Sequence, residues 1–185
     1  MSRLRSILLP LSLLIILGCS RSANAQMSVY GTVAITAYAL SPANNSTFYF
    51  KSDAPGFVIG GSYNFPIQSR LTAGLDLRLT NSPGSKGGTA GSLAFRVGFV
   101  PRVVRLRPYF EIGGGMVSVS TNSELVNDGV RAGTYTNGAA MIAFGLDVRV
   151  TSSIDIRVLE IGSEASTMSG TSYADTGIVY HFGPR

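Results

Sequence analysis

Apolar and polar residues alternate along most of this chain, and the alternation predicts β-strands. The clearest stretch is 71–80, where every second residue from Leu71 to Leu79 is leucine or alanine, and residues such as Asp76 and Arg78 lie between them. A period of two places successive side chains on opposite faces of a strand. No run of ten or more residues after position 25 shows a clear helical period of apolar positions. The sequence therefore predicts an all-β protein.

Segments of this kind recur eight times, and the connections between them differ in length. The predicted strands are about 27–40, 56–67, 69–82, 91–101, 105–121, 138–151, 153–163 and 172–183. Long connections rich in Gly, Ser, Asn, Thr and Pro fall at 41–55, 83–90, 122–137 and 164–171, and short ones at 67–69, 101–104 and 152–153. Alternating long loops and tight turns are typical of an up-and-down transmembrane barrel, with the long loops outside and the short turns in the periplasm.

A soluble carrier barrel also has eight alternating strands, so the strand charges help to separate the two interpretations. Charged residues in the predicted strands are mostly arginine and aspartate in near balance, whereas the only two lysines, Lys51 and Lys86, fall in predicted loops. Arginine suits buried ion pairs because its planar fork bonds a carboxylate at two points. Small residues share the charged faces: Gly74, Gly98, Gly113, Gly115 and Gly145. The pattern favours apolar side chains in lipid around a narrow polar lumen.

The candidate site is accordingly a lumenal charge network. Its predicted members are Asp76, Arg78, Arg96, Glu111, Asp147, Arg149, Asp155 and Arg157. We expect Asp76 and Arg96 at similar depth because their segments form a hairpin, and Glu111 level with Asp147 and Arg149. Eight strands leave an interior just wide enough for side chains, so paired charges predict a plugged lumen rather than a pore. A narrow channel remains the alternative.

Residues 1–25 have the layout of a secretory signal peptide. A basic start and an apolar run over 7–17 precede Ala23-Asn24-Ala25, a motif for cleavage after Ala25. The apolar run is too short to span a bilayer as a permanent helix. The alternative is a lipoprotein signal with lipidation at Cys19. Cleavage after Ala25 is favoured, which leaves residues 26–185 as one barrel domain.

Cleavage changes the charge and the chemistry that the chain can support. Three of the fifteen basic residues, Arg3, Arg5 and Arg21, lie in the signal segment, so twelve remain against ten acidic residues, a net charge of about +2. This balance gives no indication of nucleic-acid binding. Cys19 is the only cysteine and His181 the only histidine. A disulfide, a zinc site or a nucleophile–histidine pair is therefore disfavoured, and we expect no enzymatic activity, no metal and no cofactor.

Two stretches of the chain resemble a known family. The last segment, Thr176-Gly-Ile-Val-Tyr-His-Phe182, resembles the terminal strand of bacterial outer-membrane barrels, although Gly183-Pro184-Arg185 follow where the family pattern ends on the aromatic residue. With Arg107-Pro-Tyr-Phe-Glu-Ile-Gly-Gly-Gly-Met116, it makes the chain resemble the small eight-stranded OmpA/OmpX-like outer-membrane proteins. The resemblance implies an eight-stranded antiparallel up-and-down transmembrane β-barrel in the bacterial outer membrane. It also implies that Tyr180 and Phe182 form the signal read by the barrel-insertion machinery.

The resemblance implies fold and location better than activity. Some outer-membrane barrels are enzymes that use histidine, but His181 lies at the predicted periplasmic end of its strand, where we expect a hydrogen-bonded lumenal residue. We expect a monomer in outer-membrane lipid with a structural or surface-interaction role through its outer loops. The alternatives are a narrow channel and a soluble or lipid-anchored periplasmic ligand-binding barrel.

Overall fold

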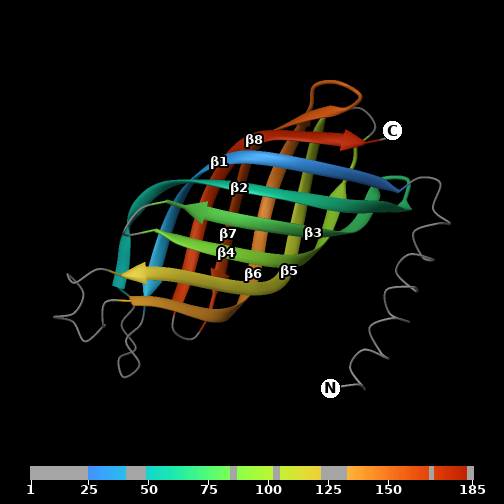
Figure 1. Cartoon of the computed structure of the whole chain (residues 1–185). Helices are drawn as coiled ribbons and strands as arrows, with labels where there is room; N and C mark the ends of the chain where they lie inside the picture. The colour runs from blue at the N-terminus through green and yellow to red at the C-terminus, as the bar shows by residue number, and fades with distance from the viewer. Residues whose placement is uncertain are drawn as a thin grey trace, which may run out of the picture.

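The computed structural model describes residues 25–40, 49–83, 87–101, 105–121, 133–166 and 169–182. These residues form eight antiparallel strands in a closed barrel (Figure 1). The strands are β1 (Gln26–Leu40), β2 (Tyr49–Gln68), β3 (Leu71–Ser82), β4 (Gly88–Phe99), β5 (Leu106–Thr121), β6 (Gly133–Arg149), β7 (Ile154–Ala165) and β8 (Ser169–Phe182). Among the described residues no helix is long and apolar enough to cross a membrane. The predicted signal segment lies outside these residues except for Ala25.

The barrel closes between its first and last strands. Met27 of β1 lies opposite Phe182 of β8, and Leu40 lies opposite Ser169. The start of β1 and the end of β8 therefore share one end of the barrel with the strand ends on either side of 69–70, 100–105 and 150–153 (Figure 1). The strand ends on either side of 41–48, 83–87, 122–132 and 166–168 lie at the other end. The predicted eight-stranded meander is confirmed.

Several strands are longer than the alternation of apolar residues predicts. β6 begins at Gly133 and β2 at Tyr49, so strands occupy residues that the sequence assigns to loops. In the extended part of β5 and β6, Thr136 donates a hydrogen bond to Ser118 at 3.0 Å. The backbone ladder continues here with polar side chains, so the two-residue period of apolar positions disappears while the strand persists.

The outer face of the barrel is apolar. The residues predicted to face lipid all project outward with 44–63% of their surface exposed: Leu75, Leu77, Phe95, Phe144 and Ile156. Their neighbours along each strand are mostly buried in the lumen. A soluble barrel has the opposite arrangement, with charges outside and apolar residues inside. The structure is therefore a transmembrane barrel, and the soluble alternative is wrong.

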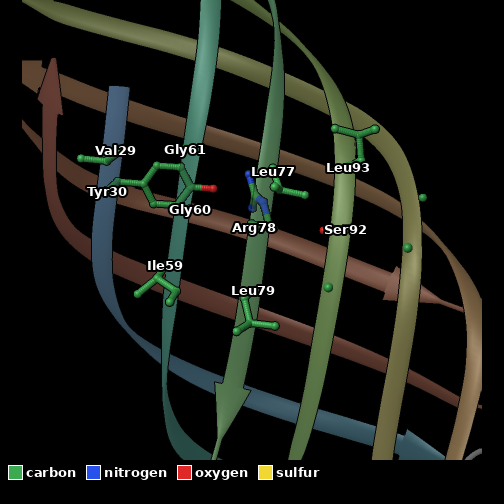
Figure 2. A pocket seen from close by; sticks show the side chains of 13 residues that line it. Val29, Tyr30, Ile59, Gly60, Gly61, Leu77, Arg78, Leu79, Ser92 and Leu93 are labelled. Carbon is green, nitrogen blue, oxygen red and sulfur yellow. The ribbon is translucent and has the colours of Figure 1, made fainter. Parts of the chain in front are cut away.

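A shallow apolar groove of about 900 Å³ crosses this outer face over β1 to β5. Figure 2 shows the large side chains that border it, among them Leu77 on β3 and Leu93 on β4. Strand register places Gly61, Leu77, Leu93 and Gly114 in one row across the sheet. The groove arises because a glycine stands on each side of the two leucines in that row, and it leaves the lipid-facing wall apolar but uneven.

Candidate functional site: the lumenal charge network

Arg78 of β3 is the centre of the buried charges. Its side chain is inaccessible to solvent and bonds Glu111 on β5 and Glu160 on β7. Its Nε donates to Asp76 Oδ1 at 3.1 Å, and its Nη1 donates to the hydroxyl of Tyr173 on β8. Charge-assisted bonds of this kind are the strongest in proteins, and a guanidinium can make several at once. One arginine therefore connects four strands through the lumen.

Glu160 is the matching acidic centre. Its carboxylate accepts hydrogen bonds from Arg78, Tyr109 and Tyr173, and it pairs with Arg157 at 2.9 Å. The residue is completely buried. A buried carboxylate is tolerable only when several donors replace the water it has lost. The donors come from β3, β5, β7 and β8, so the acid stabilises contacts right across the barrel.

Two further arginines extend the network toward the end with the short turns. Arg96 of β4 bonds Asp147 Oδ2 at 3.0 Å and lies 3.4 Å from Glu111 Oε1. Arg157 of β7 bonds Asp147 Oδ1 at 3.2 Å, so both arginines share one carboxylate on β6. The Arg96 guanidinium also lies 3.5 Å above the ring of Tyr109, a cation–π geometry. The pairs form one continuous cluster rather than isolated bridges.

The structure brings most of the predicted site residues together but differs in detail. Asp76 and Arg96 do meet, although only at 3.9 Å. Glu111 lies opposite Arg96 on β4 and Ala143 on β6. The prediction that Glu111 lies at the same depth as Asp147 is therefore wrong. The strand pair β5–β6 is shifted relative to that expectation, and Asp147 lies opposite Arg107 instead.

Two predicted members lie away from the central cluster. Arg149, at the end of β6, donates from Nε to the Thr151 carbonyl at 3.3 Å, and among the described residues it forms no ion pair. Asp155 is buried, but it pairs with Arg107 at 3.5 Å and with His181 at 3.0 Å rather than with the central arginines. Both therefore belong to the short-turn end of the lumen.

Sequence reasoning missed Glu160 because a β-bulge reverses the alternation of β7. Asp155 and Arg157 face the lumen, and continued alternation would place residue 159 inside. Instead Val158 and Leu159 are both exposed, at 49% and 45%, and the pairing with β8 shifts between Arg157 and Glu160. Two outward residues in succession turn Glu160 inward. The adjacent apolar pair Val158-Leu159 was the available signal.

The same change of phase buries Glu164, which accepts a hydrogen bond from Ser92 at 2.9 Å. Asp175 of β8 is also buried and lies directly opposite Glu160. Neither oxygen of the Asp175 carboxylate has a hydrogen-bond partner among the described residues. Both acids escaped the prediction, although Asp175 shares the lumenal face of its strand with His181. The described residues hold no group of three or more His, Cys, Asp or Glu arranged to bind a metal.

Tyrosine hydroxyls that donate to the network belong to rings that pack over a glycine on the neighbouring strand. Tyr109 lies opposite Gly145 in the β5–β6 register, and Tyr173 opposite Gly162 in the β7–β8 register. A Cβ added at Gly145 would come within 2.1 Å of the Tyr109 ring, and one at Gly162 within 2.3 Å of the Tyr173 ring. These glycines are required because each leaves the space that its partner's ring fills.

Tyr30 and Gly60 repeat the arrangement on β1 and β2. The Tyr30 hydroxyl donates to Asp76 Oδ1 at 2.7 Å, while its ring lies 4.2 Å from the Arg157 guanidinium. Burial of three tyrosines among the charges supplies both hydroxyl donors and aromatic faces for the arginines. Gly60, Gly145 and Gly162 thus mark where these three rings lie.

Apolar side chains pack in the lumen at the end with the longer connections, beside buried polar ones such as Thr36 and Thr171. Val117 and Val119 of β5 are completely buried there with Tyr38 and Ala90. The Tyr38 hydroxyl donates to the Gly88 carbonyl at 3.0 Å. The prediction of a narrow polar lumen is therefore incomplete, because an apolar group also packs inside it.

His181 lies in the lumen at the short-turn end of the barrel. Its Nδ1 lies 3.0 Å from Ser28 Oγ, and its Nε2 lies 3.0 Å from Asp155 Oδ2. The order of atoms is reminiscent of a Ser–His–Asp triad, but Ser28 is completely buried, so no substrate carbonyl can reach it. The chain of bonds joins β1, β8 and β7 where the barrel closes. The predicted hydrogen-bonded lumenal role of His181 is confirmed.

Comparison with solved structures places this fold among outer-membrane barrels. The chain is similar to Ail, the attachment invasion locus protein of Yersinia pestis, with a TM-score of 0.57 and 11% identity over 86% of this chain and 99% of Ail. It is also similar to Neisserial surface protein A, with a TM-score of 0.52 and 15% identity over 84% and 97% of the two chains. The N-terminal barrel of Pseudomonas aeruginosa OprF gives a TM-score of 0.51 and 19% identity over 82% and 97%.

These similarities establish a shared fold. No protein-family model matches the chain, and no curated protein matches its sequence. The structures confirm the predicted resemblance to small eight-stranded outer-membrane barrels at the level of architecture.

Proposed function

We propose that this protein is a bacterial outer-membrane barrel whose lumen is closed by the Arg78–Glu160 cluster, and that it serves as a rigid support for its outer loops. The observation that carries the proposal is an apolar wall around a lumen crossed by fully buried ion pairs. Buried pairs are costly unless every partner is held in place, so the cluster favours one fixed arrangement over a mobile gate. The role is structural or one of surface interaction, without catalysis.

The proposal includes export by the signal segment 1–25, cleavage after Ala25, and insertion through the aromatic end of β8. Tyr180 and Phe182 support that role because both rings project outward, at 44% and 45% exposure. The two rings pack edge to face, with their centroids 4.9 Å apart. Outer-membrane lipid and the insertion machinery are then the expected partners, and the barrel is a monomer. The short connections face the periplasm and the longer ones face outward.

Membrane fractionation combined with surface labelling tests location and topology together. An epitope tag inserted in 122–132 is expected to be accessible to antibody on intact cells, whereas a tag after Arg185 is expected to be accessible only after the outer membrane is permeabilised. The reverse labelling contradicts the topology, and recovery in the soluble periplasmic fraction contradicts the location.

Conductance in a planar bilayer tests the closed lumen. The purified barrel is expected to give no steady single-channel current, because charged and apolar layers fill its interior. Steady current in the wild-type protein favours the narrow-channel alternative. Current that appears only in a Glu160→Ala, Arg78→Ala double variant supports the proposal, since that variant empties the centre of the lumen.

A further inference from the structure

The short-turn end of the barrel opens into a pocket lined by positive and neutral donors. The pocket has a volume of about 360 Å³, within the roughly 300–1,000 Å³ typical of small-molecule sites. Every charged residue that lines it is an arginine: Arg70 in the β2–β3 turn, Arg107 on β5 and Arg149 on β6. The other lining residues are three amides, two hydroxyl residues and three apolar residues, namely Gln26, Asn64, Gln68, Ser69, Thr72, Pro66, Leu71 and Val100.

These residues lie close together because the strands that carry them begin or end at the same opening of the barrel, called the mouth below. Gln26 of β1 lies opposite Asn64 of β2, and the backbone of Val100 donates to the Arg70 carbonyl at 2.8 Å. On the far side, the backbone of Arg149 donates to the Arg105 carbonyl at 2.9 Å, which adds a further exposed arginine to the rim. The described residues of the three short connections contain no acid. The positive charge of the rim is therefore uncompensated there.

The nearest acids lie deeper and are already engaged. Asp155 borders a smaller cavity of about 60 Å³ below the mouth and pairs with both Arg107 and His181. Asp147 borders the same cavity and is shared by Arg96 and Arg157. Both carboxylates therefore already bond lumenal partners, although Asp155 also lies directly opposite Arg149 in the β6–β7 register.

Gln26 gives an independent indication of the missing ligand. Its amide nitrogen is buried at the pocket and has no hydrogen-bond partner among the described residues. A buried donor without an acceptor is costly, and each such group calls for an explanation. An acceptor-rich anion in the pocket satisfies this donor and the arginines together.

We infer that this pocket binds a phosphate group at the periplasmic mouth of the barrel. A phosphate offers several acceptor oxygens, and the planar fork of arginine bonds two of them at once. The group can belong to a soluble phosphate compound or to a lipid headgroup at the membrane edge, since both present the same chemistry. The inference concerns the opposite end from the outer loops and does not depend on their role.

The test is calorimetric titration of inorganic phosphate into protein purified from outer membranes in a nonionic detergent. Saturable binding is expected, and Arg149→Gln and Arg70→Gln are each expected to weaken it about tenfold. Lys51→Gln is the matched control, because this substitution also removes one positive charge. Lys51 lies opposite Tyr38, toward the other end of the β1–β2 pair. Unchanged heat-modifiable migration in gels verifies that the variants are folded.

A second arm separates the two sources of phosphate. Protein in nanodiscs of phosphatidylcholine, with and without phosphatidylglycerol, is examined by native mass spectrometry for retained lipid. Binding of free phosphate supports a soluble ligand, and retention of phosphatidylglycerol that is lost in Arg149→Gln supports a headgroup. Absence of both kinds of binding overturns the inference, as does binding that the arginine variants leave unchanged.

Discussion

Arg78 on β3 bonds Glu160 on β7, and these strands stand on opposite walls of the eight-stranded barrel. The contact joins residues 82 positions apart in the chain. Two residues of β5 also take part, because Glu111 accepts a hydrogen bond from Arg78 and Tyr109 donates one to Glu160. The centre of the lumen therefore depends on a pair that no hairpin of the sequence brings together.

Removing either partner is expected to destabilise the barrel strongly. Arg78→Ala and Glu160→Ala should each lower the free energy of unfolding by about 3–5 kcal/mol, because each leaves a buried charge uncompensated. The double variant should lose at least about 1 kcal/mol less than the sum of the two single losses. Urea unfolding in lipid vesicles measures all three. Arg149→Ala, at the rim, is the control and should change stability by no more than about 0.5 kcal/mol.

Arg96 is expected to couple more strongly to Asp147 than to Asp76. Its Nη2 lies 3.0 Å from Asp147 Oδ2, whereas its Nη1 lies 3.9 Å from Asp76 Oδ2. Double-mutant cycles with alanine at the three positions should therefore give the larger coupling energy for the Arg96–Asp147 pair. A coupling energy with Asp76 that equals or exceeds the one with Asp147 would contradict the observed geometry.

The bulge in β7 predicts two neighbouring residues in lipid. Spin labels on cysteines introduced at Val158 and Leu159 should both be accessible to oxygen dissolved in the bilayer, because both side chains project outward. Labels at Leu79 and Thr80 provide the control on a regular strand, where only Leu79 projects outward. If accessibility alternates between 158 and 159 as it does between 79 and 80, the bulge is absent and Glu160 faces lipid.

The space above Gly145 should tolerate no larger side chain. Gly145→Val is expected to displace the Tyr109 ring from Glu160 and to cost about 1–3 kcal/mol through overpacking. Gly138→Val, on the same strand, is the matched control, because a Cβ there meets no atom within 4 Å. It should be neutral or stabilising, since valine favours strands. Equal losses at the two positions would refute the pairing of Tyr109 with Gly145.

A charge on the lipid face should cost more than a charge at the lumenal mouth. Leu75→Arg is expected to lower the free energy of unfolding by about 2–4 kcal/mol if residue 75 lies near the bilayer midplane. Thr72→Arg on the same strand enters the water-accessible pocket at the mouth and should cost less. The comparison uses urea unfolding in vesicles, and a larger loss for Thr72→Arg contradicts the assignment of faces.

The sequence by itself determined the strands, their order and the two faces of the barrel wall. Leu75 and Leu77 could be assigned to one face and Asp76 to the other because side-chain direction in a strand follows position with a period of two. Neighbouring strands in a meander are also neighbours in sequence, so the order of the sheet followed from the order of the segments. These properties are local, and a local pattern is enough to predict them.

Only the tertiary structure decided which charges meet and what lies at the two ends of the lumen. Pairing of Arg78 with Glu160 depends on the registers of several strand pairs and on the bulge at Val158 and Leu159, and an error of one residue in any register moves a side chain to the other face. The donor-lined mouth likewise combines Gln26, Arg70 and Arg149 from distant parts of the chain. Closure of the barrel brings these groups together, and closure is a property of all eight strands at once.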